Sequence, residues 1–428
     1  MALTLRSALV ELLGVPLALM SPHWFWLVYV VLAIAVVVDL VLAGAVSQLR
    51  LVRDGDVSTR LGETAQISLL ITNAGRRKLR GRVRDGWPPS AGATPRDQLV
   101  TVPAGERRRI ITTLNPTRRG ERKPGRITVR STGPLGVAAR QRSTQLDWSL
   151  RVLPSFASRK HLPSRLKRLR ELDGAIATHV RGEGTEFDSL REYVIGDDVR
   201  SVDWRATARR GDVVVRTWRP ERDRHVQLVI DTARTSAGRI ADTPRLDWSM
   251  DACLLLAALA SRAGDRVDLL AMDRAVRASV ERASTGELLA SLVAAMTPLQ
   301  PALVEPDHRQ VLAEIVRRTR RRSLVVLMTA LDPAAFEEGW LPVVKTLTKR
   351  HVVVVASVAD PLVEEMASRR GDAAAVYAAA AAEQARGQRA RLAAALRRFG
   401  AEVVDAPPET FAPALADCYL ALKAAGRL

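Results

Sequence analysis

The apolar and polar positions divide the chain into segments with different periodicities. Residues 24–46 form an almost unbroken apolar run that begins with an aromatic cluster and contains one charge, Asp39. A helix needs about 20 apolar residues to cross the hydrocarbon core of a bilayer. The run therefore predicts a transmembrane helix with aromatic side chains at one interface.

A shorter apolar stretch, residues 7–20, precedes this run and predicts the first arm of a helical hairpin, with a single span as the alternative. Arg6 precedes the two arms, and Arg50 and Arg53 follow them. Because basic flanks stay on the cytoplasmic side, we expect a multi-pass protein of the plasma membrane with both ends and most of the chain in the cytoplasm. In such a hairpin Arg6 would face Asp39 near the inner interface.

Residues 47–153 contain short alternating or β-branched runs separated by turn residues, which is typical of an all-β, sandwich-like domain. The segment has 22 basic and 8 acidic residues, so it carries most of the formal net charge of +19. A solvated arginine face and contact with anionic lipid are both open interpretations. Nucleic acid is disfavoured because only Trp87 and Trp148 could stack on bases. The expected strands are residues 65–73, 79–87, 108–116 and 125–132.

Residues 154–224 are polar, and their most densely charged part is the stretch 196–212 around Trp204. Its glycines lead into no G-K-[ST] ending, which disfavours a nucleotide-binding loop. Arginine–carboxylate pairs are directional, so such a segment can fix the orientation of two neighbouring domains. We expect Trp204 to be the apolar anchor of this segment. A solvated loop and a catalytic role are the alternatives.

Partners for two of these charges follow from strand geometry. Asp203 and Arg205 would point to opposite sides of an extended segment. We expect Asp203 to accept from an arginine in residues 216–224 and Arg205 to pair with Glu192 or Asp188.

From residue 225 onward apolar strands alternate with helices, which predicts an α/β domain with a mostly parallel, Rossmann-like sheet covered on both faces. Such sheets carry their sites at the carboxyl ends of the strands. Cys253 and Cys418 lie in predicted helices without metal-type spacing and are expected to be free thiols. The expected strands are residues 225–232, 265–272, 323–331, 351–359 and the "AEVVDA" run, residues 401–406.

The charged stretch "GEGTEFDSLREYVIGDDVRSVDWRATARRGDVVVRTWRPERD" closely resembles the defining motif of the bacterial domain-of-unknown-function 58 family. The run "RRGERKPGRITVRSTGPLGVAAR" is similar to the end of that family's β-domain, although "STGPLGV" departs from its usual form. The resemblance implies a membrane hairpin (1–46), a β-domain (47–153), the charged motif (154–224) and a von Willebrand factor A-like domain (225–428). The motif residues are Glu186, Phe187, Arg191, Tyr193, Gly196, Asp197, Asp198, Arg200, Asp203, Trp204, Arg205 and Arg216.

The stretches "DTARTS" and "TALDP" at two strand ends resemble the metal-ion-dependent adhesion site of von Willebrand factor A-type domains. The resemblance implies Asp231, Thr235 and Asp332 as metal ligands. Ala233 stands where the first hydroxyl is expected, and a hard cation takes about six oxygen ligands. We therefore expect weak Mg²⁺ binding or none. In the alternative interpretation, the two aspartates cap helices or bond loop amides.

The family resemblance further implies co-operation with a MoxR-type AAA ATPase, but no established reaction. We expect a membrane-anchored, cytoplasm-facing scaffold or adaptor that serves cell-envelope or complex assembly, with the lipid bilayer and other envelope proteins as further partners. No catalytic constellation or firm cofactor is evident from the residues. A metal-dependent hydrolase and a basic module that binds nucleic acid or anionic lipid are the alternatives.

Overall fold

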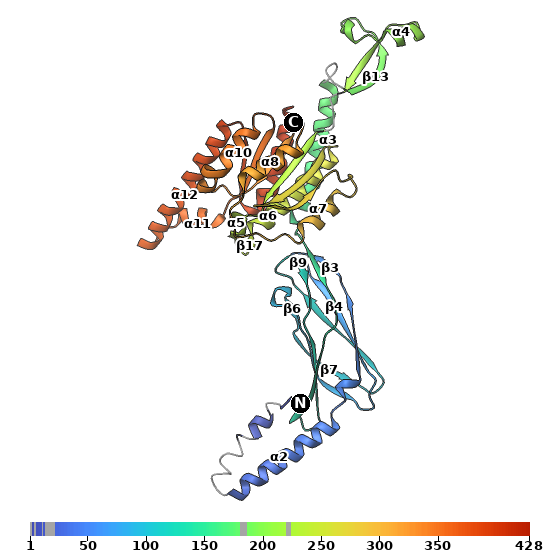
Figure 1. The fold of residues 1–428 in the computed structure, drawn as a ribbon, viewed down its shortest axis with the longest axis vertical. Coiled ribbons are helices and arrows are strands. Elements are labelled where there is room, and N and C mark those ends of the chain that lie inside the picture. The colour runs from blue at the N-terminus through green and yellow to red at the C-terminus, as the bar shows by residue number, and fades with distance from the viewer. Residues whose placement is uncertain (1, 4–5, 11, 13–21, 180–185, 220–223) are drawn as a thin grey trace. The chain divides into compact units, whose positions relative to one another are not determined.

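The computed structural model divides into two compact units, Met1–Leu153 and Pro154–Leu428 (Figure 1). The expected segments 1–46 and 47–153 fall in the first unit, and 154–224 and 225–428 fall in the second. The structure describes residues 2–3, 6–10, 12, 22–179, 186–219 and 224–428.

The apolar run forms the helix α2 (Pro22–Leu42). At about 1.5 Å per residue, its 21 residues extend about 31 Å, which matches a hydrocarbon core about 30 Å thick. Among the described residues α2 is the one helix long and apolar enough to cross a membrane. The expected multi-pass anchor is therefore not supported by these residues, since most of the first arm, 7–20, lies outside them. A broad face of α2 exposes Trp26, Val30, Ile34, Val37 and Val41.

The first unit continues as the expected β-domain, built from three sheets. The five-stranded sheet has the order β1-β11-β10-β5-β7, the four-stranded sheet β2-β4-β8-β6, and the three-stranded sheet β3-β12-β9. The strands are β1 (Ala2–Leu3), β2 (Leu49–Gly55), β3 (Ser58–Arg60), β4 (Ala65–Asn73), β5 (Leu79–Asp85), β6 (Ala93–Thr94), β7 (Asp97–Val102), β8 (Arg107–Leu114), β9 (Gly120–Arg122), β10 (Ile127–Thr132), β11 (Ala138–Thr144) and β12 (Leu150–Leu153).

Alternate side chains of these strands are buried, which is why the expected strands at β4, β5, β8 and β10 are confirmed. Residues from the two larger sheets share one core, which contains Ile71 of β4 and Val83 of β5. The core also holds an ion pair, since Arg53 bonds Asp85 at 2.5 Å and both side chains are nearly inaccessible. Arg53 is therefore a core residue and not a charge at the membrane interface.

The second unit contains a six-stranded sheet with the order β19-β18-β15-β20-β21-β22. All neighbouring strands are parallel except β19, which pairs antiparallel with β18 at one edge. The mostly parallel sheet predicted from the apolar runs is confirmed. The strands are β15 (His225–Asp231), β18 (Arg266–Met272), β19 (Val276–Val280), β20 (Leu324–Met328), β21 (Val352–Val358) and β22 (Glu402–Ala406).

Helices cover both faces of this sheet (Figure 1). On one face the strands share a core with Ile315, Trp340 and Leu396, and on the other α6 packs with α3 and α13. The main helices are α3 (Leu162–His179), α6 (Arg245–Arg262), α7 (Leu288–Met296), α8 (His308–Arg318), α10 (Leu341–Leu347), α11 (Pro361–Ser368), α12 (Ala373–Arg398) and α13 (Pro408–Ala424). Shorter elements are α5 (Arg234–Ala237), β16 (Arg239–Ile240), β17 (Thr243–Pro244), α9 (Pro333–Ala335) and a π-helical turn (Phe336–Trp340).

Both cysteines are free thiols, as expected. Burial raises the pKa of Cys253 to about 12 and that of Cys418 to about 11. Neither thiol is therefore a thiolate nucleophile near neutral pH.

Candidate functional site

The charged motif folds as a β-hairpin with a structured tip. β13 (Glu186–Glu192) pairs antiparallel with β14 (Val214–Arg219), and the tip holds a 3₁₀ turn (Val199–Ser201) and the short helix α4 (Trp204–Arg210). The segment is thus extended at Asp203, the N-cap residue, but not at Arg205, because helix α4 begins at Trp204. The side chains of Glu186 and Phe187 lie outside the described part of the chain.

Asp203 has two roles in this tip. Its Oδ1 accepts from the backbone N–H groups of Arg205 and Ala206, both at 3.0 Å, and so caps α4. Its Oδ2 accepts from Arg216 Nε at 2.9 Å, which confirms the arginine partner expected for Asp203. The Ala206 N–H and the Arg216 guanidinium hold the pKa of Asp203 below its usual value.

A second pair organises the strand end. Arg191 donates to both oxygens of Asp197, at 2.8 and 2.5 Å, in the two-pronged geometry that makes such pairs directional. The pKa of Arg191 is raised by this carboxylate. Asp197 also accepts from Val194 N–H at 2.9 Å, while Asp198 caps the 3₁₀ turn through Arg200 N–H at 2.9 Å.

These charges therefore build the hairpin tip, and they leave its apolar side chains in solvent. Ile195 is 97% exposed, Trp204 66%, and Val194 and Val199 61% each. Trp204, expected to be the apolar anchor of this segment, lies largely in solvent among the described residues of the second unit, and its role between the two domains stays a prediction. Glu192 and Asp188 were the partners expected for Arg205. Arg205 forms no ion pair with Glu192 or with any other side chain that the structure describes, and the side chain of Asp188 is not among those described.

The carboxyl edge of the six-stranded sheet brings together Asp231, Thr235 and Thr329. Asp231 Oδ2 accepts from the hydroxyls of Thr235 at 3.0 Å and Thr329 at 2.7 Å, and its Oδ1 accepts from Ala233 N–H at 2.8 Å. Burial raises the pKa of Asp231 above its usual value despite these three hydrogen bonds. Both carboxylate oxygens are thus already bonded to the protein.

Asp332 does not complete a cation site at this edge. Its Oδ1 accepts from Ala334 N–H at 3.0 Å and caps α9. Nearby, Arg234 pairs with Glu305, which raises the pKa of Arg234. The described residues contain no group of three or more His, Cys, Asp or Glu side chains arranged to hold a metal ion. The donor set fits a hard cation poorly, and weak or absent Mg²⁺ binding stays a prediction.

Sequence reasoning missed two residues at the same edge. Asp273 follows β18 and accepts from Thr232 Oγ1 at 3.0 Å and from Arg277 Nε at 2.8 Å. Its position directly after a predicted strand was the available signal. His308 lies edge-to-face against Trp340, with ring centroids 5.0 Å apart, and burial lowers its pKa. A groove of about 620 Å³ beside it is lined by Arg274, Glu305, His308 and Gly339.

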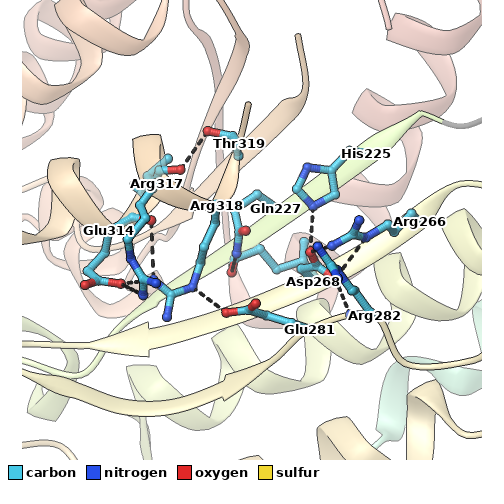
Figure 2. Close-up of polar contacts among 12 residues, drawn as sticks. His225, Gln227, Arg266, Asp268, Glu281, Arg282, Glu314, Arg317, Arg318 and Thr319 are labelled. Atoms are coloured by element: carbon cyan, nitrogen blue, oxygen red, sulfur yellow. Dashed lines mark hydrogen bonds and ion pairs between the residues drawn. The ribbon is translucent and has the colours of Figure 1, made fainter. Parts of the chain in front are cut away.

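The opposite edge of the sheet holds a polar network (Figure 2). His225 Nδ1 lies 3.1 Å from Ser323 Oγ, and His225 Nε2 lies 2.9 Å from Asp268 Oδ2. The same three residue types form the catalytic triad of many hydrolases. Ser323 is only 5% exposed, and its hydroxyl also lies 2.9 Å from the carbonyl of Arg321. The cavity that His225 and Ser323 line has a volume of about 30 Å³, room for water but not for a substrate, so we interpret the network as structural.

Asp268 is the centre of this network. Burial opposes its charge, but hydrogen bonds from His225, Arg266 and Arg282 N–H lower the pKa of Asp268 to about 2. A separate group in Figure 2 joins Arg318 to Glu281 at 2.9 Å and to Glu314. Both groups connect neighbouring strands and helices. We therefore assign these charged side chains, which lie away from the carboxyl edge, a structural role.

Residues 189–396 match the family model described as protein of unknown function DUF58. The match begins within β13 and ends within α12, so it supports the family resemblance over this part of the chain. Uncharacterized protein Rv1480 of Mycobacterium tuberculosis is 29% identical over 201 residues, which are 45% of this chain and 62% of that protein. Uncharacterized protein Mb1516 of Mycobacterium bovis has the same identity and coverage. The chain thus spans about 62% of the length of these relatives.

Solved structures give only distant likenesses. The CARDB domain of a Pyrococcus furiosus protein, in complex with di-metal ions, covers 24% of this chain and 91% of its own, with 16% identity and a TM-score of 0.19. A β-N-acetylglucosaminidase from Vibrio harveyi covers 84% and 75%, with 10% identity and a TM-score of 0.20. TM-scores this low carry no argument about fold or function.

Proposed function

We propose that this protein is a membrane-anchored, cytoplasm-facing adaptor whose β13–β14 hairpin binds a protein partner. The observation that carries the proposal is the exposed apolar tip: Ile195, Val199 and Trp204 lie in solvent on a frame that two arginine–carboxylate pairs hold. A preorganised frame lowers the entropy cost of binding. Exposed aromatic and branched side chains surrounded by charge are typical of interface centres.

The two-helix anchor is kept as part of this proposal because of how β1 pairs. β1 pairs with β11 through Ala2↔Ala139 and Leu3↔Ala138, so residues 2–3 lie on the same side as the β-domain. The end of α2 also contacts β11. If α2 crosses the bilayer, Leu3 and Pro22 lie on opposite sides of it. Arg50, just after α2, favours the cytoplasmic side for the β-domain.

The family resemblance supplies the class of partner, a MoxR-type AAA ATPase. A von Willebrand factor A-like assignment for the second unit is supported by the antiparallel edge strand β19 and by Asp231 at the end of the central strand β15. In this proposal the hairpin docks the ATPase and the membrane anchor localises the assembly in the cell envelope.

The test is a crosslinking pull-down of the full chain from native membranes, with and without ATP. We expect the double variant Ile195→Asp/Trp204→Ala to lose at least about tenfold of the crosslinked ATPase, as removal of interface hot spots does. Leu303→Asp/Tyr377→Ala is the matched control, because Leu303 is 83% and Tyr377 78% exposed outside the hairpin. Both variants should keep the wild-type melting temperature.

Recovery of no ATPase with the wild-type chain would refute this class of partner. Equal recovery with both double variants would refute the hairpin as the docking site.

A further inference from the structure

The end of α2 is locked into the β-domain by a buried carboxylate. Asp39 is 0% exposed and accepts from the backbone N–H groups of Leu135 at 2.8 Å, Val137 at 2.6 Å and Ala138 at 3.0 Å. The sequence predicts a pair between Arg6 and Asp39, and this prediction is wrong. Arg6 donates instead to the carbonyl of Leu135, at 3.2 Å. The turn between β10 and β11 therefore closes around the last turns of the helix.

A second loop meets α2 just beyond its end. A Cβ built on Gly44 would lie 2.9 Å from both Lys78 O and Leu79 Cα, so the backbones are in direct contact there. Trp24 and Trp26 mark the far interface of α2, and Asp39 lies close to its other end, at Leu42. The β4–β5 loop and the β10–β11 turn are consequently the parts of the β-domain nearest the bilayer that α2 crosses.

These membrane-proximal parts are strongly basic. Arg76, Arg77 and Lys78 form the loop, and all three are exposed. Arg80 follows on β5, and its carbonyl accepts from Thr132 Oγ1 beside the β10–β11 turn. None of these four side chains forms an ion pair with a described residue. Their charges are therefore available to an outside partner.

The basic surface continues along the outer face of the five-stranded sheet. Arg82 lies directly opposite Arg130 in the β5–β10 pairing. Like charges in opposed positions destabilise a strand pair, and Arg130 also donates to Gln141 Oε1 at 3.1 and 2.9 Å. A bound anion would offset the repulsion between the two guanidinium groups. Arg82 is about 7 Å beyond Arg80 along the strand, because residues rise about 3.3 Å each. That distance is within the Debye length of about 8–10 Å in physiological salt.

We propose that the loop Arg76–Lys78, together with Arg80, Arg82 and Arg130, binds the phosphate groups of anionic phospholipids in the bilayer crossed by α2. This inference rests on the membrane anchoring stated in the proposed function. Guanidinium groups match phosphate oxygens in charge and geometry. The hydrogen bonds of Asp39 fix the distance between this surface and the bilayer, so the β-domain meets the headgroups in one orientation. A nucleic acid fits less well, since Trp87 is partly buried against the core and Arg53 lies over one face of its ring.

The test uses the full chain in phosphatidylcholine nanodiscs that contain spin-labelled phosphatidylglycerol or spin-labelled phosphatidylcholine. Electron paramagnetic resonance measures the fraction of each label that the protein immobilises. We expect preferential immobilisation of phosphatidylglycerol that weakens as NaCl is raised. Arg76→Gln/Arg77→Gln/Lys78→Gln should reduce that preference by about tenfold or more, given the attraction of each basic residue to an anionic surface.

The matched control is Arg118→Gln/Lys123→Gln/Arg126→Gln, which removes the same charge far from α2. Arg126 precedes Gly133 by seven residues, about 23 Å along an extended strand. This control should keep the lipid preference, and both triple variants should keep the wild-type melting temperature.

Equal immobilisation of the two labels by the wild-type chain, or equal loss in both triple variants, would overturn the inference. Displacement of labelled phosphatidylglycerol by a short DNA duplex at physiological salt would overturn it in favour of nucleic acid. Failure of the wild-type chain to enter nanodiscs would refute the membrane anchoring itself, which distinguishes the two proposals.

Discussion

Gly133 is the position where a single methyl group should release α2 from the β-domain. A Cβ at Gly133 would lie 2.3 Å from Asp39 Oδ1, 2.5 Å from Asp39 Cα and 2.6 Å from Asp39 Cβ. Gly133 is not among the residues with positive φ, so alanine would suit its backbone. The effect of Gly133→Ala should therefore come from overlap with α2 and not from backbone strain.

The magnitude follows from what the overlap displaces. Overpacking costs about 1–3 kcal/mol. Separation of Asp39 from its three N–H donors adds the loss of hydrogen bonds to a charged group, each worth about 1.5–3 kcal/mol. Because the turn can relax in part, we expect Gly133→Ala to lower the local stability of this lock by about 3–5 kcal/mol. A loss of 3 kcal/mol corresponds to a change in opening equilibrium of more than about a hundredfold.

Hydrogen exchange measures this directly in the full chain in detergent micelles. The amides of Leu135, Val137 and Ala138 should be protected in the wild-type chain and should exchange at least about a hundredfold faster in Gly133→Ala. Gly125→Ala is the control, since its Cβ would meet only Gly86 O, at 3.6 Å. Unchanged protection in Gly133→Ala, or equal loss in the control, would show that Asp39 does not sit in this turn.

Three further outcomes are expected. The pKa of Asp268 is about 2, below its usual value, so its pairing stabilises the fold above about pH 4, and this stability is lost as the pH falls toward 2. Asp268→Asn should lower the free energy of unfolding by about 1–2 kcal/mol at pH 7, less than the full pKa shift implies because Arg266 is partly exposed. In thermal melts, the difference in melting temperature between Asp268→Asn and the wild-type chain should shrink below pH 4. Titration calorimetry of the wild-type chain should show weak or no Mg²⁺ binding, and Ala233→Ser should strengthen it; tight wild-type binding would contradict the poor fit of the donors. Asp39→Lys should reduce membrane-inserted protein, and the added Arg6→Asp should not restore it, because the partners of Asp39 are backbone N–H groups; recovery in the double variant would favour a direct ion pair.

Local periodicity was sufficient to locate most elements. The alternation of residues 65–73 matches β4 (Ala65–Asn73), and the apolar run at 351–359 matches β21 (Val352–Val358). A strand buried on one face alternates apolar and polar residues, and a strand buried on both faces is a continuous apolar run. β19 was missed because its residues are largely exposed and show neither pattern.

The charged motif shows where local patterns fail. The sequence placed Asp203 near an arginine, and Arg216 takes that role at 2.9 Å. Read as extended, however, the stretch gave no sign of α4, whose cap depends on the carboxylate of Asp203. The exposure of Trp204 depends on how the hairpin folds back on itself, which composition does not encode.

By itself, the sequence determined the apolar helix, the β-rich and α/β halves, and the aspartates at the strand ends, because each depends on neighbours within a few residues. Only the tertiary structure decided what Asp39 binds. Its three donors lie nearly one hundred positions away in the chain, and backbone N–H groups are chemically the same at almost every residue. The same holds for Thr329 at the carboxyl edge, which donates to Asp231 from 98 positions away and leaves a cation fewer free ligands. Contacts of this kind are set by strand order and register, which fix distances that no local pattern contains.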